Sequence, residues 1–173
     1  MQHRKFFVFG ILILQSLICF SASTERFLHY TEVDGLPRNI TTCVEQDQYG
    51  YIWIGTNNGV ARYDGKNFMQ FEELSDAGII QLLYDSQQNL WSATNKGLFK
   101  YNPVTNYFDM VFDGYISRLY ENNSIVYFLM MSNIYVIENN QPRLFFHEND
   151  ISDFCFTDAG LWVSKSNDGL SLL

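Results

Sequence analysis

The residue types that most often perform catalysis or hold metals are few and scattered in this sequence. After Ser23, histidine occurs only at His29 and His147, each in a strand-like segment without neighbouring ligands. A zinc site needs clustered histidine, cysteine or carboxylate ligands at short spacing, and a catalytic triad needs a base beside its nucleophile. We therefore predict no catalytic residue, no metal site and no cofactor.

Asp34, Asp64 and Asp168 each stand directly before a glycine in a turn-like segment. Loop carboxylates can bind calcium. Asp-Gly is also the usual composition of a tight turn, because aspartate accepts hydrogen bonds from nearby backbone N–H groups and glycine adopts positive φ. We favour the turn interpretation for all three.

Cys43 and Cys155 each lie in a short apolar, strand-like run. An oxidising compartment would permit a disulfide between them, but two cysteines so far apart in sequence do not make a disulfide framework. Cysteine is also common as a small buried apolar residue. A bridge and buried free thiols both remain open, and we favour the free thiols.

The start of the chain, up to Ser23, has the layout of a secretory signal peptide. Arg4 and Lys5 precede an apolar run from Phe6 to Phe20, and Ser21-Ala22-Ser23 ends the segment with small side chains. The apolar run is roughly 15 residues long, whereas a membrane-spanning helix needs about 20. We therefore expect cleavage and a periplasmic or other extracytoplasmic location, with a permanent anchor as the less favoured alternative.

The chain has 173 residues and a formal net charge of −8. Without Arg4 and Lys5, 9 basic residues against 19 acidic ones leave −10. This acidic balance argues against nucleic acid and anionic membranes as partners, and against strongly anionic ligands unless arginines gather locally. The 17% aromatic content favours β structure.

A hairpin unit that recurs along the chain is the strongest feature of the sequence. Its first copy, GYIWIGTNNGVARYD, runs from Gly50 to Asp64 and contains an Asn-Gly turn signal between two apolar runs. The pattern returns around three later aromatic residues, so that Trp53, Trp91, Phe128 and Trp162 follow one another at nearly even intervals. Regular spacing of this kind indicates a repeat architecture.

Each copy is typical of four short strands, so we predict an all-β fold of propeller-type blades with four antiparallel strands each. The predicted segments are a signal peptide (1–23), a strand and loop (24–39) with its strand at Phe27–Tyr30, blades at 40–77, 78–114 and 115–150, and an incomplete blade at 151–173. These are about three and a half blades, which we expect to form an open stack. The predicted repeat anchors are Trp53, Gly59, Tyr63, Trp91, Gly97, Tyr101, Phe128, Trp162 and Gly169.

The repeat resembles the two-component regulator propeller repeat. The family pattern is an acidic residue, a turn, Leu-Trp-Ile-Gly-Thr, two turn residues, Gly-Leu and Tyr-Asp. The first copy meets it through Asp47, Gly50, Trp53, Ile54, Gly55, Thr56, Gly59, Tyr63 and Asp64. The second has Ser92-Ala93 in place of Ile-Gly, the third departs most, and the fourth has Lys165-Ser166 where threonine is expected.

This resemblance extends over about residues 25–173 and implies the N-terminal periplasmic sensor region of a hybrid two-component histidine kinase. Members of that family often respond to oligosaccharides. The resemblance further implies a partial member, whose remaining propeller blades and downstream kinase domains would be partners. A full-length parent would be anchored in the inner membrane, with a homodimer as a further possibility.

Three functional hypotheses follow. The first is an exported module that senses an oligosaccharide and performs no chemistry. The second is a propeller fragment for protein–protein interaction, and the third, less favoured, is part of an exported propeller enzyme such as a lyase. Propellers bind ligands through loops at the ends of the ring, and amide and arginine side chains suit sugars. The predicted ligand contacts are Arg38, Asn57, Asn58, Asn95, Lys96 and Asn167.

Overall fold

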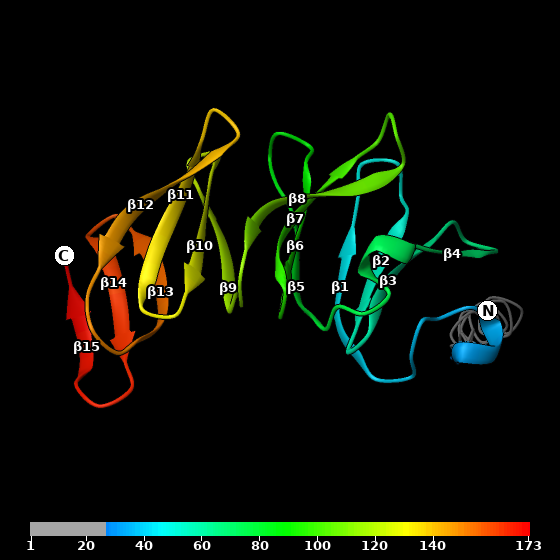
Figure 1. Ribbon diagram of the computed structural model, residues 1–173, viewed down its shortest axis with the longest axis horizontal. Helices are drawn as coiled ribbons and strands as arrows, with labels where there is room; N and C mark the ends of the chain where they lie inside the picture. Colours follow the sequence, from blue (N-terminus) through cyan, green and yellow to red (C-terminus); the bar gives the residue numbers. More distant parts are fainter. Residues whose placement is uncertain (1–26) are drawn as a thin grey trace, which may run out of the picture.

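The computed structural model describes residues 27–173, so the predicted signal peptide at residues 1–23 lies outside the described part. The described chain folds into four antiparallel sheets, which lie side by side in sequence order (Figure 1). Three sheets have four strands, the last has three, and none of these four sheets closes on itself. The prediction of an all-β, open array of propeller-type blades is confirmed.

We call the four sheets blades 1 to 4. Blade 1 contains β1 (Thr41–Gln46), β2 (Ile52–Thr56), β3 (Gly59–Tyr63) and β4 (Phe68–Gln70). Blade 2 contains β5 (Ile79–Tyr84), β6 (Leu90–Thr94), β7 (Gly97–Asn102) and β8 (Tyr107–Asp113). Blade 3 contains β9 (Arg118–Asn122), β10 (Ile125–Met130), β11 (Asn133–Glu138) and β12 (Gln141–His147). Blade 4 contains β13 (Ile151–Thr157), β14 (Gly160–Lys165) and β15 (Gly169–Leu172).

The predicted strand at Phe27–Tyr30 is wrong. These residues have no regular secondary structure and lead into the short 3-10 helix η1 (Glu32–Asp34), which Thr31 caps. A strand needs a neighbour to satisfy its backbone groups, and no strand within residues 27–173 pairs with this segment. Tyr30 instead packs its ring against Tyr63 and Phe68, and its hydroxyl lies 2.7 Å from that of Tyr63.

Aromatic side chains fill the space between blades 1 and 2. Trp53 of β2 is 1% exposed and stacks on Phe71 at a centroid distance of 5.3 Å. It also meets Tyr101 and Phe108 of blade 2 edge-on, at 4.7 and 5.9 Å. Such offset and edge contacts are the favoured arrangement of aromatic pairs. Trp53 therefore packs between blades 1 and 2.

Phe128 faces the opposite way from the other repeat anchors. Trp53 and Trp91 each pack towards the blade that follows, but Phe128 packs back against blade 2 in the cluster that contains Trp91 and Leu98. Its neighbour Tyr127 faces blade 4, where its ring lies 4.5 Å from that of Phe156. Alternate residues of a strand point to opposite faces, so assigning Phe128 to the place of tryptophan is wrong by one residue. The connection between β9 and β10 is shorter than its equivalents in blades 1 and 2, and this hides the shift in the sequence.

The first strands of the first three blades contact one another through specific side chains. Gln81 of β5 donates its amide N–H to the carbonyl of Leu119 in β9 and accepts from the N–H of Leu119, at 3.0 and 2.9 Å. Between blades 1 and 2, Ile79 of β5 packs beside Gly55 of β2, which pairs with Cys43 of β1. A Cβ atom at Gly55 would lie 2.5 Å from Cys43 Sγ and 2.7 Å from Ile79 Cγ2, so the glycine of the Trp-Ile-Gly-Thr pattern is needed for this approach.

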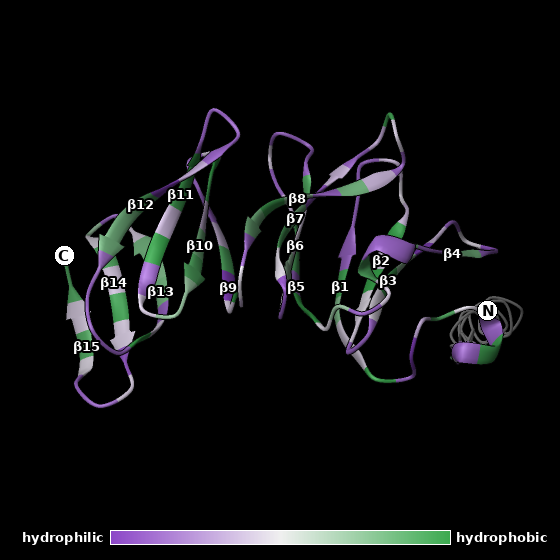
Figure 2. Ribbon diagram, viewed as in Figure 1, coloured by the Kyte–Doolittle hydropathy of each residue, from purple (hydrophilic) through white to green (hydrophobic). Residues whose placement is uncertain are grey.

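The up-and-down order of strands divides the turns between two ends of the array. The β7–β8 and β11–β12 turns lie at the top of Figure 1, and the β14–β15 turn lies at the bottom. Figure 2 shows that the β11–β12 turn is hydrophilic, whereas apolar residues are concentrated in the strands. Turns between first and second strands share the upper end with those between third and fourth strands.

Two short 3-10 helices, η1 and η2 (Glu72–Leu74), are the helical elements of residues 27–173. In that part of the chain no helix has both the length and the apolar character needed to cross a membrane.

Candidate functional site: a cleft between the first two blades

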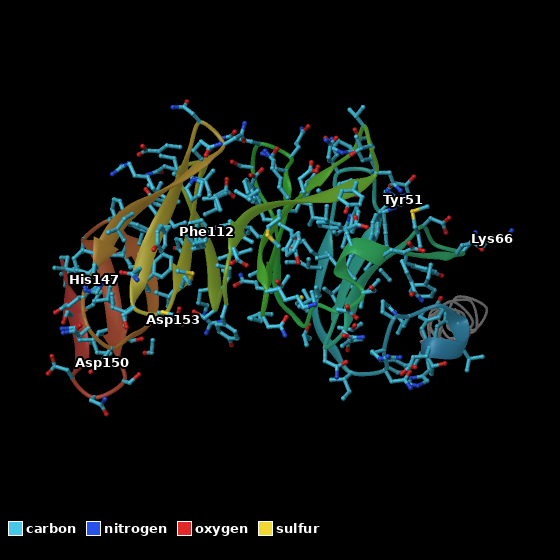
Figure 3. All side chains as sticks on the ribbon, viewed as in Figure 1. Tyr51, Lys66, Phe112, His147, Asp150 and Asp153 are labelled. Atoms are coloured by element: carbon cyan, nitrogen blue, oxygen red, sulfur yellow. The ribbon has the colours of Figure 1, made fainter. Side chains whose placement is uncertain are left out.

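A hollow with a volume of about 650 Å³ lies between blades 1 and 2. Its walls come from the β1–β2 turn, the β5–β6 turn and the β7–β8 turn, together with β3. Figure 3 places Tyr51, which lines this cleft, at the upper edge of blade 1. The lining includes five aromatic residues, Tyr49, Tyr51, Trp53, Tyr84 and Tyr101, and five amides, Gln48, Gln87, Gln88, Asn89 and Asn106.

Asp47 organises the blade 1 wall of this cleft. One carboxylate oxygen accepts hydrogen bonds from the backbone N–H groups of Tyr49 and Tyr51, at 2.9 and 3.0 Å. The other accepts from the indole N–H of Trp53 at 2.9 Å. The aspartate thereby shapes the turn that carries two tyrosines and also fixes the tryptophan beneath them, and its hydrogen-bonding capacity is largely used by the fold.

Asp85 performs the same task in blade 2. It accepts from the backbone N–H groups of Gln87 and Asn89, at 3.0 and 2.7 Å, and from the indole N–H of Trp91 at 2.7 Å. The amide of Asn89 donates to both of its oxygens, at 3.1 and 3.0 Å. This side chain is 5% exposed, so the turn that presents Gln87 and Asn89 to the cleft rests on a buried and fully used carboxylate.

Arg62 is the one cation among the residues that line the cleft. Its guanidinium lies over the rings of Tyr51 and Trp53, at 4.6 and 5.4 Å from their centroids, a cation–π arrangement. It also donates a 3.1 Å hydrogen bond to the hydroxyl of Tyr101. Within residues 27–173, Arg62 has no ion pair with a carboxylate.

Tyr101 links the arginine to the blade 2 wall. Its hydroxyl donates to Asn106 Oδ1 at 2.7 Å, so Arg62, Tyr101 and Asn106 form a hydrogen-bonded row across the two blades. Burial raises the pKa of Tyr101, while the nearby Arg62 partly offsets this effect by stabilising the phenolate. Tyr101 is therefore neutral at physiological pH and serves as both hydrogen-bond donor and acceptor.

Two smaller hollows continue from the cleft towards blade 3, with volumes of about 420 and 350 Å³. Asn89 lines all three. Lys100, Trp91 and Asn140 line both smaller hollows. The Lys100 ammonium lies 4.9 Å from the Trp91 ring centroid and donates to Asn140 Oδ1 at 3.0 Å.

The arrangement is suited to binding. Flat aromatic faces, amides that donate and accept, and a few fixed charges are the usual means of orienting a polar small molecule. Asp47, which lines the cleft, and Asp85, which lines one of the smaller hollows, are occupied by the turns and tryptophans that they support. Among residues 27–173, no group of three or more histidine, cysteine, aspartate or glutamate side chains is placed to hold a metal ion.

The six ligand contacts predicted from the sequence lie elsewhere. Arg38 and Asn58 meet at a hollow of about 190 Å³ beside Pro37 and Ser75, and Arg38 pairs with Glu32 at 3.6 Å. Asn167 lies in the β14–β15 turn of blade 4. The structure therefore brings Arg38 and Asn58 to a common hollow, and all six residues stay predictions as ligand contacts.

Of the remaining three, Asn57 contacts the segment before β1, and Asn95 and Lys96 contact the connection between blades 1 and 2. The backbone N–H of Asn57 donates to the carbonyl of Ile40 at 3.0 Å. Asn95 Oδ1 accepts from the N–H of Gly78 at 2.9 Å, and Lys96 lies 3.9 Å from Asp76. These contacts within the fold account for the amide and charge of the two β6–β7 turn residues.

The cysteines agree with the sequence interpretation only in part. Cys43 and Cys155 are both free thiols. Cys43 is half-buried between β1 and β5, and this burial raises its pKa. The prediction that Cys155 is buried is wrong: it is exposed, because it lies opposite Trp162 on the face of blade 4 that no described element covers.

The Asp-Gly pairs are turns, as interpreted from the sequence. Asp64 accepts from the backbone N–H groups of Lys66 and Asn67, at 2.8 and 2.6 Å, and these bonds hold its pKa below the usual value. Asp34 accepts from the N–H of Thr31 at 2.7 Å. The glycines Gly35, Gly65 and Gly169 all have positive φ.

The cleft itself is missed by the sequence-based prediction. Tyr49, Tyr51 and four of its five amides come from the turns between first and second strands, whereas the candidate asparagines belong to the turns between second and third strands. The sequence feature that points to the cleft is the pair Tyr49 and Tyr51 beside Asp47. These two aromatic residues lie in the β1–β2 turn, at the upper end of the array.

Comparison with known proteins agrees with this fold. The family model described as "Two component regulator propeller" matches residues 35–58, which include β1, β2 and the Asp47–Trp53 contact. Histidine kinase P4 of Formosa agariphila is 32% identical over 68 residues, which make up 38% of this chain and 5% of that protein. The match therefore spans a small part of that relative.

Two solved structures from B. thetaiotaomicron share the fold. Both are of an extracellular domain, described as that of a putative one component system in one case and of a putative hybrid two component system in the other. Their TM-scores are 0.67 and 0.69 at 23% and 21% identity, and the matches cover 83% and 87% of this chain but 22% and 23% of those chains. The resemblance found in the sequence is confirmed: the chain carries a two-component regulator propeller repeat within an open array of propeller-type blades.

Proposed function

We propose that this chain is a non-catalytic sensing region of a two-component regulatory system, that it lies outside the cytoplasm, and that it recognises an oligosaccharide. The matching repeat model, the relative named as a histidine kinase and the two extracellular domains with the same fold support the regulatory role and the location. The histidine kinase that would receive the signal is the proposed partner.

The observation that supports ligand recognition most directly is the convergence of two blades on one cleft. Tyr49 and Tyr51 of blade 1 face Gln87 and Asn89 of blade 2 across a volume of about 650 Å³. Sugar rings offer apolar faces to aromatic side chains and hydroxyl groups to amides, and both kinds of partner are present here.

Occupation of the cleft would also supply a means of signalling. A ligand that contacts both blades binds best when their relative positions are fixed, so it stabilises that arrangement over others. The Arg62–Tyr101–Asn106 row already joins the two blades across the cleft. A ligand held beside it would tighten the same junction.

A thermal-shift screen of neutral and acidic oligosaccharides with the full chain tests this function. A ligand present at about 100 times its Kd stabilises the native state by about 2.7 kcal/mol, which corresponds to a rise in Tm of roughly 5–10 °C for a domain of this size. At least one oligosaccharide class should produce such a rise.

Tyr51→Ala removes an aromatic wall and should abolish the shift. Tyr107→Ala serves as the matched control, because Tyr107 is a half-exposed tyrosine on β8 and does not line the cleft. The absence of a shift with every saccharide, or an equal shift in the Tyr51→Ala protein, would contradict the proposed function.

A further inference from the structure

Two cations occupy equivalent positions in the two blades that form the cleft and its extension. Arg62 of β3 stands directly opposite Trp53 of β2, and Lys100 of β7 stands directly opposite Trp91 of β6. Each holds its charge over the tryptophan ring, at 5.4 and 4.9 Å. In blades 3 and 4 the corresponding cross-strand partners are uncharged: Val136 stands opposite Tyr127, and Leu172 opposite Trp162.

Neither cation is neutralised by the described part of the chain. Across residues 27–173, Arg62 and Lys100 take part in none of the ion pairs, although six others are formed. Arg62 donates to Tyr101 Oη and Met69 Sδ, and Lys100 donates to Asn140 Oδ1, all of them uncharged acceptors.

The nearby carboxylates are engaged in other contacts. Asp47 and Asp85 accept from turn backbone and from the two tryptophan indoles. Asp109 pairs with Lys100 across the β7–β8 ladder, but its carboxylate accepts from Asn102 Nδ2 at 3.3 Å. The two positive charges are therefore left available at the surface of the hollows.

Two neighbouring cations without a carboxylate partner are unusual in a chain with 19 acidic and 11 basic residues. Most of the surface of such a protein repels anions, so a local pair of cations attracts an anionic group specifically to this region. A guanidinium held over aromatic rings is also pre-oriented for a carboxylate or sulfate, with which it forms strong charge-assisted hydrogen bonds.

The hollows adjoin one another and lead from Arg62 to Lys100. Arg62 lines the large cleft, Lys100 lines the two smaller hollows, and Asn89 lines all three. Tyr101 and Pro103 also line both the large cleft and one of the smaller hollows. A linear ligand of several sugar rings fits a path of this kind better than a compact one does.

Building on the function proposed above, we propose that the ligand is an acidic oligosaccharide, and that Arg62 and Lys100 are the residues that select its anionic groups. The anionic group is a carboxylate or a sulfate. The aromatic and amide walls bind the sugar rings, and the two cations distinguish a charged chain from a neutral one.

Isothermal titration calorimetry on the full chain tests this proposal with matched probes. Tetragalacturonate is compared with its methyl ester, and a sulfated galactan tetrasaccharide is compared with its desulfated counterpart. At least one acidic probe should bind about tenfold or more tightly than its neutral partner, the difference expected for one added charge-assisted hydrogen bond. The pair that shows the preference identifies the group as carboxylate or sulfate.

Variants locate the source of the preference. Arg62→Met and Lys100→Met should each reduce the preference for the acidic probe over its neutral partner severalfold. Arg143→Met is the matched control, since it removes one positive charge from β12, where Arg143 pairs with Glu138 away from the cleft. Arg62→Lys should keep much of the preference and guards against a folding defect in Arg62→Met.

Each outcome has a distinct meaning. If neutral and acidic probes bind equally, or if Arg143→Met lowers the preference as much as Arg62→Met, the selection by Arg62 and Lys100 is wrong while oligosaccharide sensing stands. Failure of all four saccharides to bind overturns the proposal of an acidic ligand, whereas oligosaccharide sensing itself is decided by the thermal-shift screen. Binding of inorganic tripolyphosphate as tightly as the acidic saccharides would also overturn the selection of a sugar acid, because it would indicate a general anion site.

Discussion

At the scale of single residues, two aspartates account for much of the repeat. Asp47 and Asp85 each bind two backbone N–H groups of their own turn and the indole N–H of the tryptophan in the strand that follows. One side chain thereby couples the turn to the interblade core. The acidic residue of the sequence pattern is structural, and the chemistry of the cleft is left to the tyrosines, amides and Arg62.

Replacing Asp85 with asparagine should destabilise the chain by about 1–3 kcal/mol, because an amide N–H₂ group then faces donors inside a buried site. Urea unfolding followed by tryptophan fluorescence measures the change. Asp109→Asn alters a carboxylate with a single weak hydrogen bond, so it should change stability by less than about 0.5 kcal/mol. Equal losses in the two variants would show that the Asp85 contacts contribute nothing special.

At the scale of elements, the contact between first strands depends on small side chains. Cys43 Sγ and Ile79 Cγ2 occupy the space beside Gly55, whereas blade 2 has Ala93 at the matching position, paired across the ladder with Gln81. Blade 2 therefore has alanine in place of the glycine of the Trp-Ile-Gly-Thr pattern, and the residue opposite it is glutamine instead of cysteine.

Gly55→Ala should destabilise the chain by about 1–3 kcal/mol through overpacking. In the Cys43→Ala background the same change should cost clearly less, because the closest atom is gone. A double-mutant cycle from urea unfolding of the four proteins measures this coupling. Additive losses would contradict the proposed role of Gly55 in admitting Cys43.

The strands of blades 1 and 2 can be predicted closely from the sequence, but the orientation of some side chains cannot. β2 and β3 lie within the hairpin unit Gly50–Asp64 and flank its Asn-Gly turn, as the sequence predicts. Phe128 is misplaced by the repeat spacing because a shorter turn shifts the alternation of faces, and spacing between aromatics does not report that shift. Phe27–Tyr30 has strand-like composition, yet a strand also needs a neighbour, which local sequence does not reveal.

At the scale of the whole molecule, the cleft results from the assembly of blades. Tyr51 and Asn89 are distant in the sequence and belong to different blades, and they line the same hollow only because consecutive blades stack with their turns at one end. No single blade contains the site. For this reason, the turn composition of a single copy of the repeat predicts ligand contacts that differ from the residues lining the cleft.

The most direct test of the account is whether an oligosaccharide binds in this cleft. The chain has three tryptophans, so a ¹H–¹⁵N spectrum contains three indole N–H signals. Trp53 lines the large cleft, Trp91 lines the two smaller hollows, and Trp162 lies in blade 4. Titration with tetragalacturonate and with the sulfated galactan tetrasaccharide should move the Trp53 signal, and Trp91 to a lesser extent, while Trp162 stays in place. A Trp53 signal that stays fixed at saturating concentrations of both saccharides, or a shift of Trp162 alone, would contradict the account.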